Sequence, residues 1–312
     1  MDNLVSMLDK IVENPKLAWN KSLNQKTHLL TIDFDKNSLN ELDLNKNYFT
    51  ERPIHQFPNL KIFLSKLKKE LLLDGYGLFV LNGKNLKSFT NREIKQIFEL
   101  ICELLGNLYV QNIQGEKLVE IKNEGKSMTS GGRYHQTNEG GSYHTDSPQW
   151  KEVPDFIGLC CINPAKKGGT SKFVSTYTLH NDLLKNNPEL LRELYQNFHF
   201  DKRGEFEENE SPTTFAPIFS FSNTNLSFRY LRNYINDGQK LQNLPLNQEQ
   251  TSALDALDKL TIKDDNIVDY SLDSKDMVFF NNHRVLHGRT SFVDFDEDDK
   301  KRLLYRAWIK DL

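Results

Sequence analysis

The sequence predicts a mainly β fold with flanking helices, and three observations lead to that class. The 312 residues contain many short segments of strand-forming residues, few helical segments, and no regular alternation of strand and helix. Aromatic residues make up 11% of the chain, which is enough for a sizeable core. No repeat or low-complexity linker divides the sequence, so we expect a single domain over residues 1–312. The number of strands fits a double-sheet jelly roll.

The N-terminal part, residues 1–73, is polar and rich in lysine and asparagine, and we expect it to form peripheral helices and turns. Its last segment, residues 57–73, repeats apolar residues at helical spacing and predicts a helix. The jelly-roll core is expected over residues 74–312, with helical insertions. It begins with a predicted strand at residues 75–81. A helix follows, and the capping-box sequence Thr90–Glu93 marks its start.

From residue 107 onward, strand-like segments dominate the sequence. They lie at residues 108–113, 155–162, 171–176, 197–202, 216–222, 226–231, 266–272, 276–282 and 303–309. Two helices interrupt these strands, one at residues 179–196 with Pro188 inside it and one at residues 248–260. Such a succession of strands favours an antiparallel arrangement.

The stretch richest in chemically active side chains is residues 131–150, where glycines flank two histidines and an acid. His144 and Asp146 are two residues apart, so on a strand both side chains point to the same face. An imidazole and a carboxylate could then hold one metal ion, and this mixed ligand set suits a borderline divalent ion. The same spacing occurs at His180 and Asp182, but there the sequence predicts a helix. Residues two apart on a helix do not face each other, so we expect that pair to be structural.

A third metal ligand is expected near the C-terminus, in the segment FFNNHRVLHGRTSF. His283 and His287 are four residues apart, but Gly288 argues against a long helix. We expect a strand, a turn and a short second strand, on which Val285, His287 and Arg289 share one face. The expected ligand is His287, and His283 is expected at the surface or beside the site.

Two histidines and one carboxylate form the facial triad of non-haem Fe(II) oxygenases, which leaves adjacent positions for a cosubstrate and O₂. Zinc hydrolases also use two histidines and a carboxylate, so the triad alone leaves the metal open. A zinc hydrolase would need a general base beside the metal-bound water. The sequence has no H-E-x-x-H motif to supply one.

Two arginines near the C-terminus favour an oxygenase over a hydrolase. Arg302 and Arg306 are four residues apart on a predicted strand and therefore lie on one face. Their apolar neighbours, among them Leu304 and Trp308, indicate partial burial, and buried arginines need anionic partners. A planar guanidinium holds a carboxylate through two hydrogen bonds. A dicarboxylate cosubstrate could therefore chelate iron with one end and reach Arg302 with the other.

In these residues the chain resembles the taurine dioxygenase (TauD/TfdA-like) family of Fe(II)- and 2-oxoglutarate-dependent oxygenases. That family's pattern is H-x-D, then a Gly-Gly-x/Thr segment, then H-G-R, and then R-x-x-x-R before a terminal aromatic residue. The sequence carries these elements in the same order at residues 144–146, 168–170, 287–289 and 302–306, followed by Trp308. The resemblance extends from about residue 75 to the C-terminus.

The resemblance implies a double-stranded β-helix with flanking helices and an Fe(II) ion bound by His144, Asp146 and His287. It implies hydroxylation of an unactivated C–H bond with 2-oxoglutarate and O₂, and succinate and CO₂ as coproducts. Related halogenases replace the acid of the triad by a small residue. The carboxylate of Asp146 therefore favours oxygen transfer over halogenation.

The same resemblance implies how the organic molecules are held. Arg302, helped by Thr170, would bind the distal carboxylate of 2-oxoglutarate, and Arg306 would face an anionic group of the primary substrate. The polar, glycine-flanked segment before the metal strand offers two further substrate contacts, Asn138 first and Tyr134 next. A small amino acid or related metabolite is the substrate that the family likeness favours.

Charge and cysteine content indicate a cytoplasmic protein that does not bind nucleic acid, and the family resemblance implies a small-molecule substrate. The net charge of −3 gives no basic excess for binding nucleic acid. No apolar run approaches the ~18–20 residues of a membrane span, and the N-terminal segment lacks the apolar stretch of a signal peptide. The three cysteines form no disulfide framework, which suits a reducing compartment. We expect Cys160 and Cys161 to be core residues.

Two alternatives stay open at this point. The same fold could hydroxylate a protein side chain, with the acidic loop at residues 294–299 as a docking surface. The chain could also be a catalytically inactive metal-binding protein. Loss of a metal ligand or of the cosubstrate arginine would favour the inactive protein, and the sequence retains all of these residues.

Overall fold

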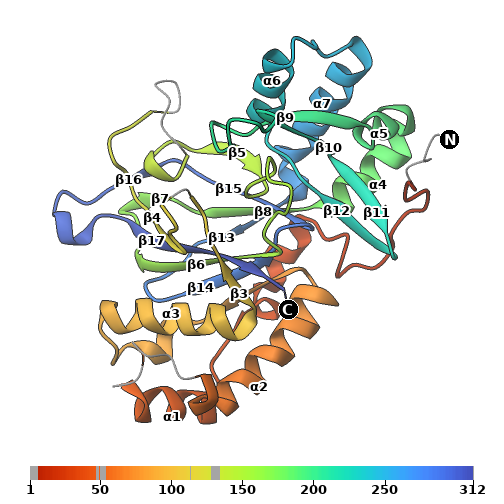
Figure 1. Cartoon of the computed structure of the whole chain (residues 1–312). Helices are drawn as coiled ribbons and strands as arrows, with labels where there is room; N and C mark the ends of the chain where they lie inside the picture. The colour runs from red at the N-terminus through yellow and green to blue at the C-terminus, as the bar shows by residue number, and fades with distance from the viewer. Residues whose placement is uncertain (1–5, 47–48, 50–53, 113, 128–133, 312) are drawn as a thin grey trace.

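Two β-sheets packed face to face organise the protein, and helices lie outside both of them (Figure 1). The computed structural model describes residues 6–46, 49, 54–112, 114–127 and 134–311. The larger sheet has the strand order β1 (Thr31–Ile32), β2 (Leu78–Leu81), β14 (Met277–Asn281), β6 (Phe156–Asn163), β17 (Leu303–Lys310) and β3 (Asn107–Tyr109), and β4 (Leu118–Ile121) also pairs with β17. The smaller sheet has the order β13 (Ile267–Tyr270), β8 (Ser171–Ser175), β15 (Val285–Arg289) and β5 (Gly141–His144).

Buried apolar side chains fill the space between the two sheets. Phe280 of β14 and Phe173 of β8 meet edge to face, with ring centroids 5.5 Å apart. Because side chains alternate along a strand, Val278 and Phe280 point into this layer, whereas Phe279 packs toward the helices on the other side. The central strands are thus buried on both faces, which explains continuous apolar runs such as FIGLCCI.

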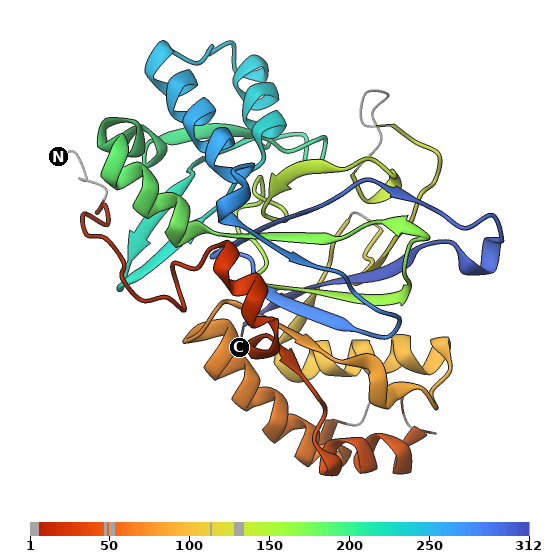
Figure 2. The ribbon, with the colours of Figure 1, turned by 180° about the vertical axis from the view of Figure 1, so that it is seen from behind.

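Two groups of helices pack on the outer faces of the sheets. The larger sheet is covered by α1 (Lys36–Leu44), α2 (Pro58–Leu67), a π-helical turn (Lys68–Leu73) and α3 (Asn91–Leu105). The second group contains α4 (Thr176–Asn186), α5 (Pro188–Leu194), α6 (Arg232–Leu241) and α7 (Gln248–Thr261), together with β9 (Asn197–Asp201), β10 (Thr213–Pro217), β11 (Phe219–Ser222) and β12 (Asn225–Phe228). Figure 2 shows the N-terminal segment running between the two groups.

Most of the predicted elements are confirmed. The mainly β class with flanking helices is correct, and the helix beginning at Thr90 has the expected capping box. The Thr90 hydroxyl accepts a hydrogen bond from the Glu93 amide at 3.3 Å, and the Glu93 carboxylate accepts one from the Thr90 amide at 2.6 Å. Cys160 and Cys161 lie in the core within β6, and burial raises the pKa of the Cys161 thiol to about 12.

Several predicted elements differ from the structure in their bounds, among them the helix expected at 57–73, which is α2 followed by the π-helical turn. The single helix expected at residues 179–196 is two helices, because Pro188 cannot continue α4 and instead begins α5. The strand expected at 216–222 is divided between β10 and β11. The strand expected at 108–113 is shorter than predicted, since β3 covers only Asn107–Tyr109.

Helix α6 is absent from the sequence prediction. Its sequence, RNYINDGQKL, is rich in residues with weak helix propensity, so its periodicity is hidden. Gly238 within it has a packing role, because a Cβ atom there would lie 2.3 Å from the carbonyl oxygen of His199. The glycine therefore allows α6 to press closely against β9, which brings this helix over the cavity described below.

Among the residues that the structure describes, no helix is both long enough and apolar enough to cross a membrane.

Candidate active site

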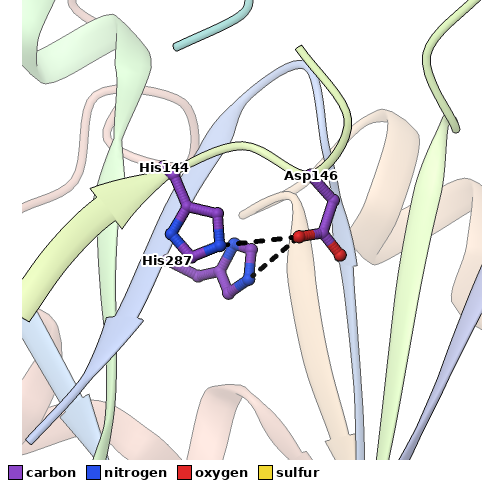
Figure 3. Close-up of side chains that lie close together, drawn as sticks. All are labelled: His144, Asp146 and His287. Atoms are coloured by element: carbon purple, nitrogen blue, oxygen red, sulfur yellow. Dashed lines mark ion pairs between the residues drawn. The ribbon is translucent and has the colours of Figure 1, made fainter. Parts of the chain in front are cut away.

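The structure brings His144, Asp146 and His287 together at one end of the smaller sheet (Figure 3). His144 ends β5, and the antiparallel pairing of β5 with β15 places His287 directly opposite it. Asp146 follows two residues later. Its Oδ1 atom is 3.5 Å from Nε2 of His144 and 3.8 Å from Nε2 of His287. One ligand atom from each residue lies within 4.8 Å of the others, so the three can converge on a single metal ion.

Asp146 is fixed in place by two side chains. Asn282 accepts a hydrogen bond from the backbone amide of Asp146 at 2.8 Å and donates one to its carbonyl oxygen at 2.9 Å. The indole Nε1 of Trp308 donates to carboxylate Oδ2 at 2.7 Å. Such supporting bonds orient a metal ligand before the metal arrives.

The protonation states of the triad suit a metal site. Burial alone would raise the pKa of Asp146, but the Arg306 guanidinium and the two histidines outweigh it and hold the pKa well below its usual range. Burial, with help from the neighbouring His144, lowers the pKa of His287 to about 3. At neutral pH the carboxyl is therefore ionised and His287 is neutral, which are the forms that bind metals.

Arg302 lines the same cavity, and its buried positive charge has no anionic partner among the described residues. Its side chain is inserted under the Phe292 ring, with the guanidinium carbon 4.8 Å from the ring centroid, and the residue is only 5% exposed. Its Nη1 atom finds no hydrogen-bond partner in the part of the chain that the structure describes. Burial and the nearby Arg289 lower the pKa of Arg302 to about 10. A carboxylate from a bound molecule is the partner this group lacks, so the residues fit a dicarboxylate cosubstrate.

Arg306 lines the same cavity, as the i, i+4 spacing on β17 predicts. Its Nε donates to Oε1 of Gln111 at 2.8 Å, and its Nη1 is 3.3 Å from Oδ2 of Asp146. Its guanidinium also stacks over the Trp308 ring at 4.9 Å. Arg306 therefore stands next to the triad itself, between Asp146 and the buried Gln111.

Thr170, expected to help bind the cosubstrate, does not reach the cavity. Its hydroxyl lies 3.1 Å from that of Ser271, on the outer side, because it shares the strand parity of Lys172, which pairs with Asp269. The next residue, Ser171, lines the cavity instead and is buried. The preceding Gly169 lies against the arginine: a Cβ there would be 3.1 Å from Nε of Arg302.

The two expected substrate contacts before the metal strand have different positions. Tyr134 lines the cavity and packs edge to face against His144 with ring centroids 5.5 Å apart, but its hydroxyl donates to the Gly141 carbonyl at 3.0 Å. Asn138 is exposed and lies outside the cavity lining. Its backbone carbonyl accepts a hydrogen bond from Phe292 at 3.1 Å, so its contribution is to the loop and not to the cavity. Arg133, in the same segment, lies outside the described residues.

Other predicted positions behave as expected. His283 bonds Asp155 at 2.9 Å, away from the triad. Arg289, which shares a strand face with His287, donates to the carbonyls of Tyr134, Thr137 and Glu139 and so fastens the loop beside the site.

The cavity has a volume of about 370 Å³ and extends from the triad outward to α6. Three residues with clear roles in it were not identified from the sequence as site residues: Gln111, Asn282 and Trp308. Gln111 was a polar residue within a predicted strand, which is the one signal that could have drawn attention to it. Trp308 was noted as an apolar neighbour and as the terminal aromatic residue of the family pattern, without a role at the metal site. Nothing local marks Asn282 as a support for Asp146.

The buried triad, the cavity and the buried Arg302 fit a non-haem iron oxygenase that uses 2-oxoglutarate. The family model for taurine catabolism dioxygenases (TauD, TfdA family) matches residues 46–308, and the chain belongs to this family. Family membership resolves the choice of metal that the triad left open, in favour of iron. The protein is a 2-oxoglutarate-dependent dioxygenase with Fe(II) and 2-oxoglutarate as cofactor and cosubstrate.

Comparisons with individual proteins agree. The chain is 31% identical over 245 residues to FR-33289 synthase of Streptomyces rubellomurinus (strain ATCC 31215), covering 77% of this chain and 70% of that protein. It is 23% identical over 265 residues to the taurine hydroxylase-like protein SAT17 of Stachybotrys chartarum (strain CBS 109288 / IBT 7711), covering 80% of this chain and 63% of that protein.

Two solved structures share the fold. An asparagine oxygenase in complex with Fe(II), 2S,3S-3-hydroxyasparagine and succinate superposes with a TM-score of 0.70 at 14% identity, covering 90% of this chain and 93% of that chain. The non-haem iron oxygenase OrfP in complex with Fe and α-ketoglutaric acid gives a TM-score of 0.64 at 16% identity, covering 90% and 94%.

Proposed function

We propose that this enzyme hydroxylates an unactivated C–H bond of a small anionic or amino-acid-like metabolite. The observation that carries the proposal is the buried guanidinium of Arg302, whose Nη1 atom has no hydrogen-bond partner among the described residues, in the cavity that also holds the His144–Asp146–His287 triad. A cavity of about 370 Å³ is of a size that takes small molecules.

Each residue of the site has a proposed role. His144, Asp146 and His287 would hold the iron, and Asn282 and Trp308 keep Asp146 oriented toward it. When bound, iron with 2-oxoglutarate and O₂ supplies the oxidation of the C–H bond, and succinate and CO₂ are released.

The organic molecules would be held by the arginines. Arg302 would pair with the distal carboxylate of 2-oxoglutarate, and we assign the supporting hydroxyl to Ser171 in place of Thr170, because Ser171 lines the cavity. Arg306 would face an anionic group of the primary substrate while it stays bonded to Gln111. Tyr134 would form part of the wall through its ring, and Asn138 has no proposed substrate contact.

The substrate class is supported by the structural relatives. An asparagine oxygenase holds a hydroxylated asparagine, and OrfP has been captured with (3S)-hydroxy-L-Arg. A protein side chain is a weaker candidate, because several acids of the loop at 294–299 have partners within the chain. Asp294 accepts a hydrogen bond from the Arg302 amide, and Asp298 pairs with Lys301.

We also infer the wider setting of the site. The strand orders of the two sheets support a jelly-roll core at residues 74–312, within one oxygenase domain that includes the peripheral residues 1–73. A cytoplasmic location is supported by three buried, free cysteines. 

The test is a turnover assay on the full chain with Fe(II), 2-oxoglutarate and isotopically labelled O₂. Small amino acids and small organic anions are added one at a time, and succinate and products are measured by mass spectrometry. We expect at least one compound to stimulate succinate formation and to gain one labelled oxygen atom. Short peptides are assayed in parallel, and stimulation only by a peptide, with none of the small compounds oxidised, would contradict the proposal.

A further inference from the structure

The turn directly after the metal strand, residues 147–150, carries two buried polar side chains without partners. Gln149 is 5% exposed and Ser147 is 7% exposed, and both line the cavity. The Oε1 atom of Gln149 and the Oγ atom of Ser147 have no hydrogen-bond partner among the described residues. A buried polar atom left unpaired costs free energy, so such atoms usually mark a site where a ligand completes the bonding.

The backbone of this turn is firmly held, so the two side chains are not simply loose. Arg229 donates from Nη1 to the carbonyls of Pro148 and Trp150, at 3.2 and 3.1 Å. The hydroxyl of Thr214 donates to the backbone carbonyl of Gln149. The Trp150 amide donates to the Ser147 carbonyl at 3.1 Å, which closes the turn.

Ser147 itself is in a conformation that serine seldom adopts. Its φ angle is +53°, in the left-handed region that glycine favours. Strain of this kind persists where the surroundings enforce it, and it is concentrated at functional sites. The turn therefore combines a strained backbone at Ser147 with two polar atoms that have no partner among the described residues, and both residues line the cavity.

We propose that Gln149 and Ser147 determine substrate specificity by binding an N–H-bearing polar group of the substrate. The free atom of Gln149 is a carbonyl oxygen, which only accepts hydrogen bonds, so its ligand must be a donor such as an amine, an amide or a guanidinium. The Ser147 hydroxyl, on the same turn, can accept a second bond from the substrate. The inference rests on the proposed function, in which Arg306 takes the anionic end of the same substrate.

A site built to bind a donor rejects an analogue that lacks it, because the acceptors are then left buried and unpaired. The substrate class is therefore a small anion with a nitrogen donor, as opposed to an aliphatic anion of equal length. The nitrogen donor narrows the substrate class, and the probes below compare a carboxylate, a sulfonate and a phosphonate as its anionic group.

The test measures binding to the full chain loaded anaerobically with Fe(II) and 2-oxoglutarate, by calorimetry. The probes are pairs that differ in one nitrogen donor. L-Asparagine and L-norvaline, and L-glutamine and L-norleucine, differ only in the side-chain amide, because all four keep the α-ammonium group. 2-Aminoethanesulfonate and propanesulfonate, and 2-aminoethylphosphonate and propylphosphonate, differ in their amine. In the unmodified chain we expect at least one probe with the additional nitrogen donor to bind about tenfold or more tightly than its partner. In Gln149→Leu we expect that preference to fall below about twofold, and in Ser147→Ala to fall in part.

The control is Gln196→Leu, which makes the same change at an exposed glutamine that does not line the cavity and should keep the preference. Thermal unfolding separates a recognition role from a structural one. Because Gln149→Leu removes an unpaired buried atom, its melting temperature should equal or exceed that of the unmodified chain. A clear fall would identify Gln149 as structural and overturn the inference.

The remaining outcomes are also decisive. Equal binding of both members of every pair, no binding of any probe, or an undiminished preference in Gln149→Leu would overturn the inference. The visible charge-transfer band of an Fe(II)–2-oxoglutarate complex is recorded in the same samples. If the band is present, any of these outcomes overturns the role of Gln149 and Ser147 in specificity and leaves the proposed function standing. If the band is absent, the proposed function fails as well.

Discussion

The chain contains the same tripeptide spacing, His-x-Asp, in two places, and the fold uses them in opposite ways. At residues 144–146 the spacing lies at the end of β5, and both side chains face the cavity with Nε2 of His144 and Oδ1 of Asp146 3.5 Å apart. At residues 180–182 it lies in helix α4, where His180 is buried against Tyr195 at 2.8 Å and Asp182 turns outward to Lys263 at 3.2 Å.

The comparison shows that the backbone conformation of the tripeptide, and not its sequence alone, decides whether the histidine and the aspartate can bind one metal ion. On an extended chain the two side chains share a face, whereas on a helix they diverge. The surroundings differ as well. Asp182 finds a lysine within the chain, whereas the first pair shares its cavity with the unpaired cation of Arg302.

The largest expected effect comes from removing the acid of each pair in turn. Asp146→Ala should abolish substrate oxidation and weaken iron binding, because it deletes the charged ligand that Trp308 and Asn282 hold in place. Asp182→Ala should leave both unchanged, since the carboxylate of that residue pairs with Lys263 and accepts a hydrogen bond from Asn186, outside the cavity. Iron content and turnover are measured for both variants. Equal losses in the two would contradict the distinction.

The next-largest effect tests whether the cavity beside His144 and Asp146 binds the anionic cosubstrate through Arg302. Arg302→Ala should weaken 2-oxoglutarate binding by about 3–5 kcal/mol, the usual result of removing one partner of a buried charge pair. Arg302→Lys should weaken it less, because the charge is kept and the two-pronged geometry is lost. Calorimetric titration of 2-oxoglutarate gives the values, with exposed Arg192→Ala as control. Unchanged affinity in Arg302→Ala would assign the cosubstrate to another residue.

A smaller effect is expected from the support of Asp146. Trp308→Phe removes the indole donor to Oδ2 and should lower iron affinity about tenfold, in the range typical of such supporting bonds. Trp19→Phe removes a comparable indole bond, to the backbone carbonyl of Tyr76 at 2.8 Å, at a residue that does not line the cavity. Competition with a metal chelator measures both affinities. The account would be wrong here if Trp19→Phe lowered iron affinity as much as Trp308→Phe.

The smallest effect concerns the histidine of the second pair and the pH dependence of stability. Burial lowers the pKa of His180 to about 4, below its value of about 6.5 in the unfolded chain. As the pH falls, the unfolded chain therefore takes up a proton at His180 before the folded chain does. The contribution of neutral His180 to the free energy of unfolding is complete above pH 6.5 and is lost as the pH falls toward 4. Between pH 7 and pH 5.5 the loss is about 1 kcal/mol.

His180→Phe should flatten this part of the stability curve. Denaturant unfolding of the variant and the unmodified chain at both pH values gives the difference in slope. Identical slopes in the two proteins would show that His180 does not contribute to the acid sensitivity.

The sequence was sufficient for the fold class and for the centre of the site. Strand periodicity separated His144–Asp146 from His180–Asp182, and the same period placed Arg302 and Arg306 on one face, as the structure confirms. These predictions succeed because each depends on a regular repeat along one element.

The parts that the sequence could not provide depend on register or on contacts between distant segments. The role of Thr170 came from the family resemblance and not from strand parity, and in the folded chain Thr170 faces Ser271 while Ser171 lines the cavity. Helix α6 is hidden by weak helix formers and is stabilised by packing against β9. The bonds from Asn282 and Gln111 cross 136 and 195 residues, so only the folded chain shows them.

The most direct test of the central claim is an anaerobic titration of the metal-free chain with Fe(II) and then 2-oxoglutarate, followed in the visible spectrum. The account predicts a metal-to-ligand charge-transfer band that is lost in His287→Ala, because that histidine completes the triad opposite His144. A His180→Phe chain should keep the band. Iron binding without any band on addition of 2-oxoglutarate would contradict the assignment of this cavity as an iron and 2-oxoglutarate site.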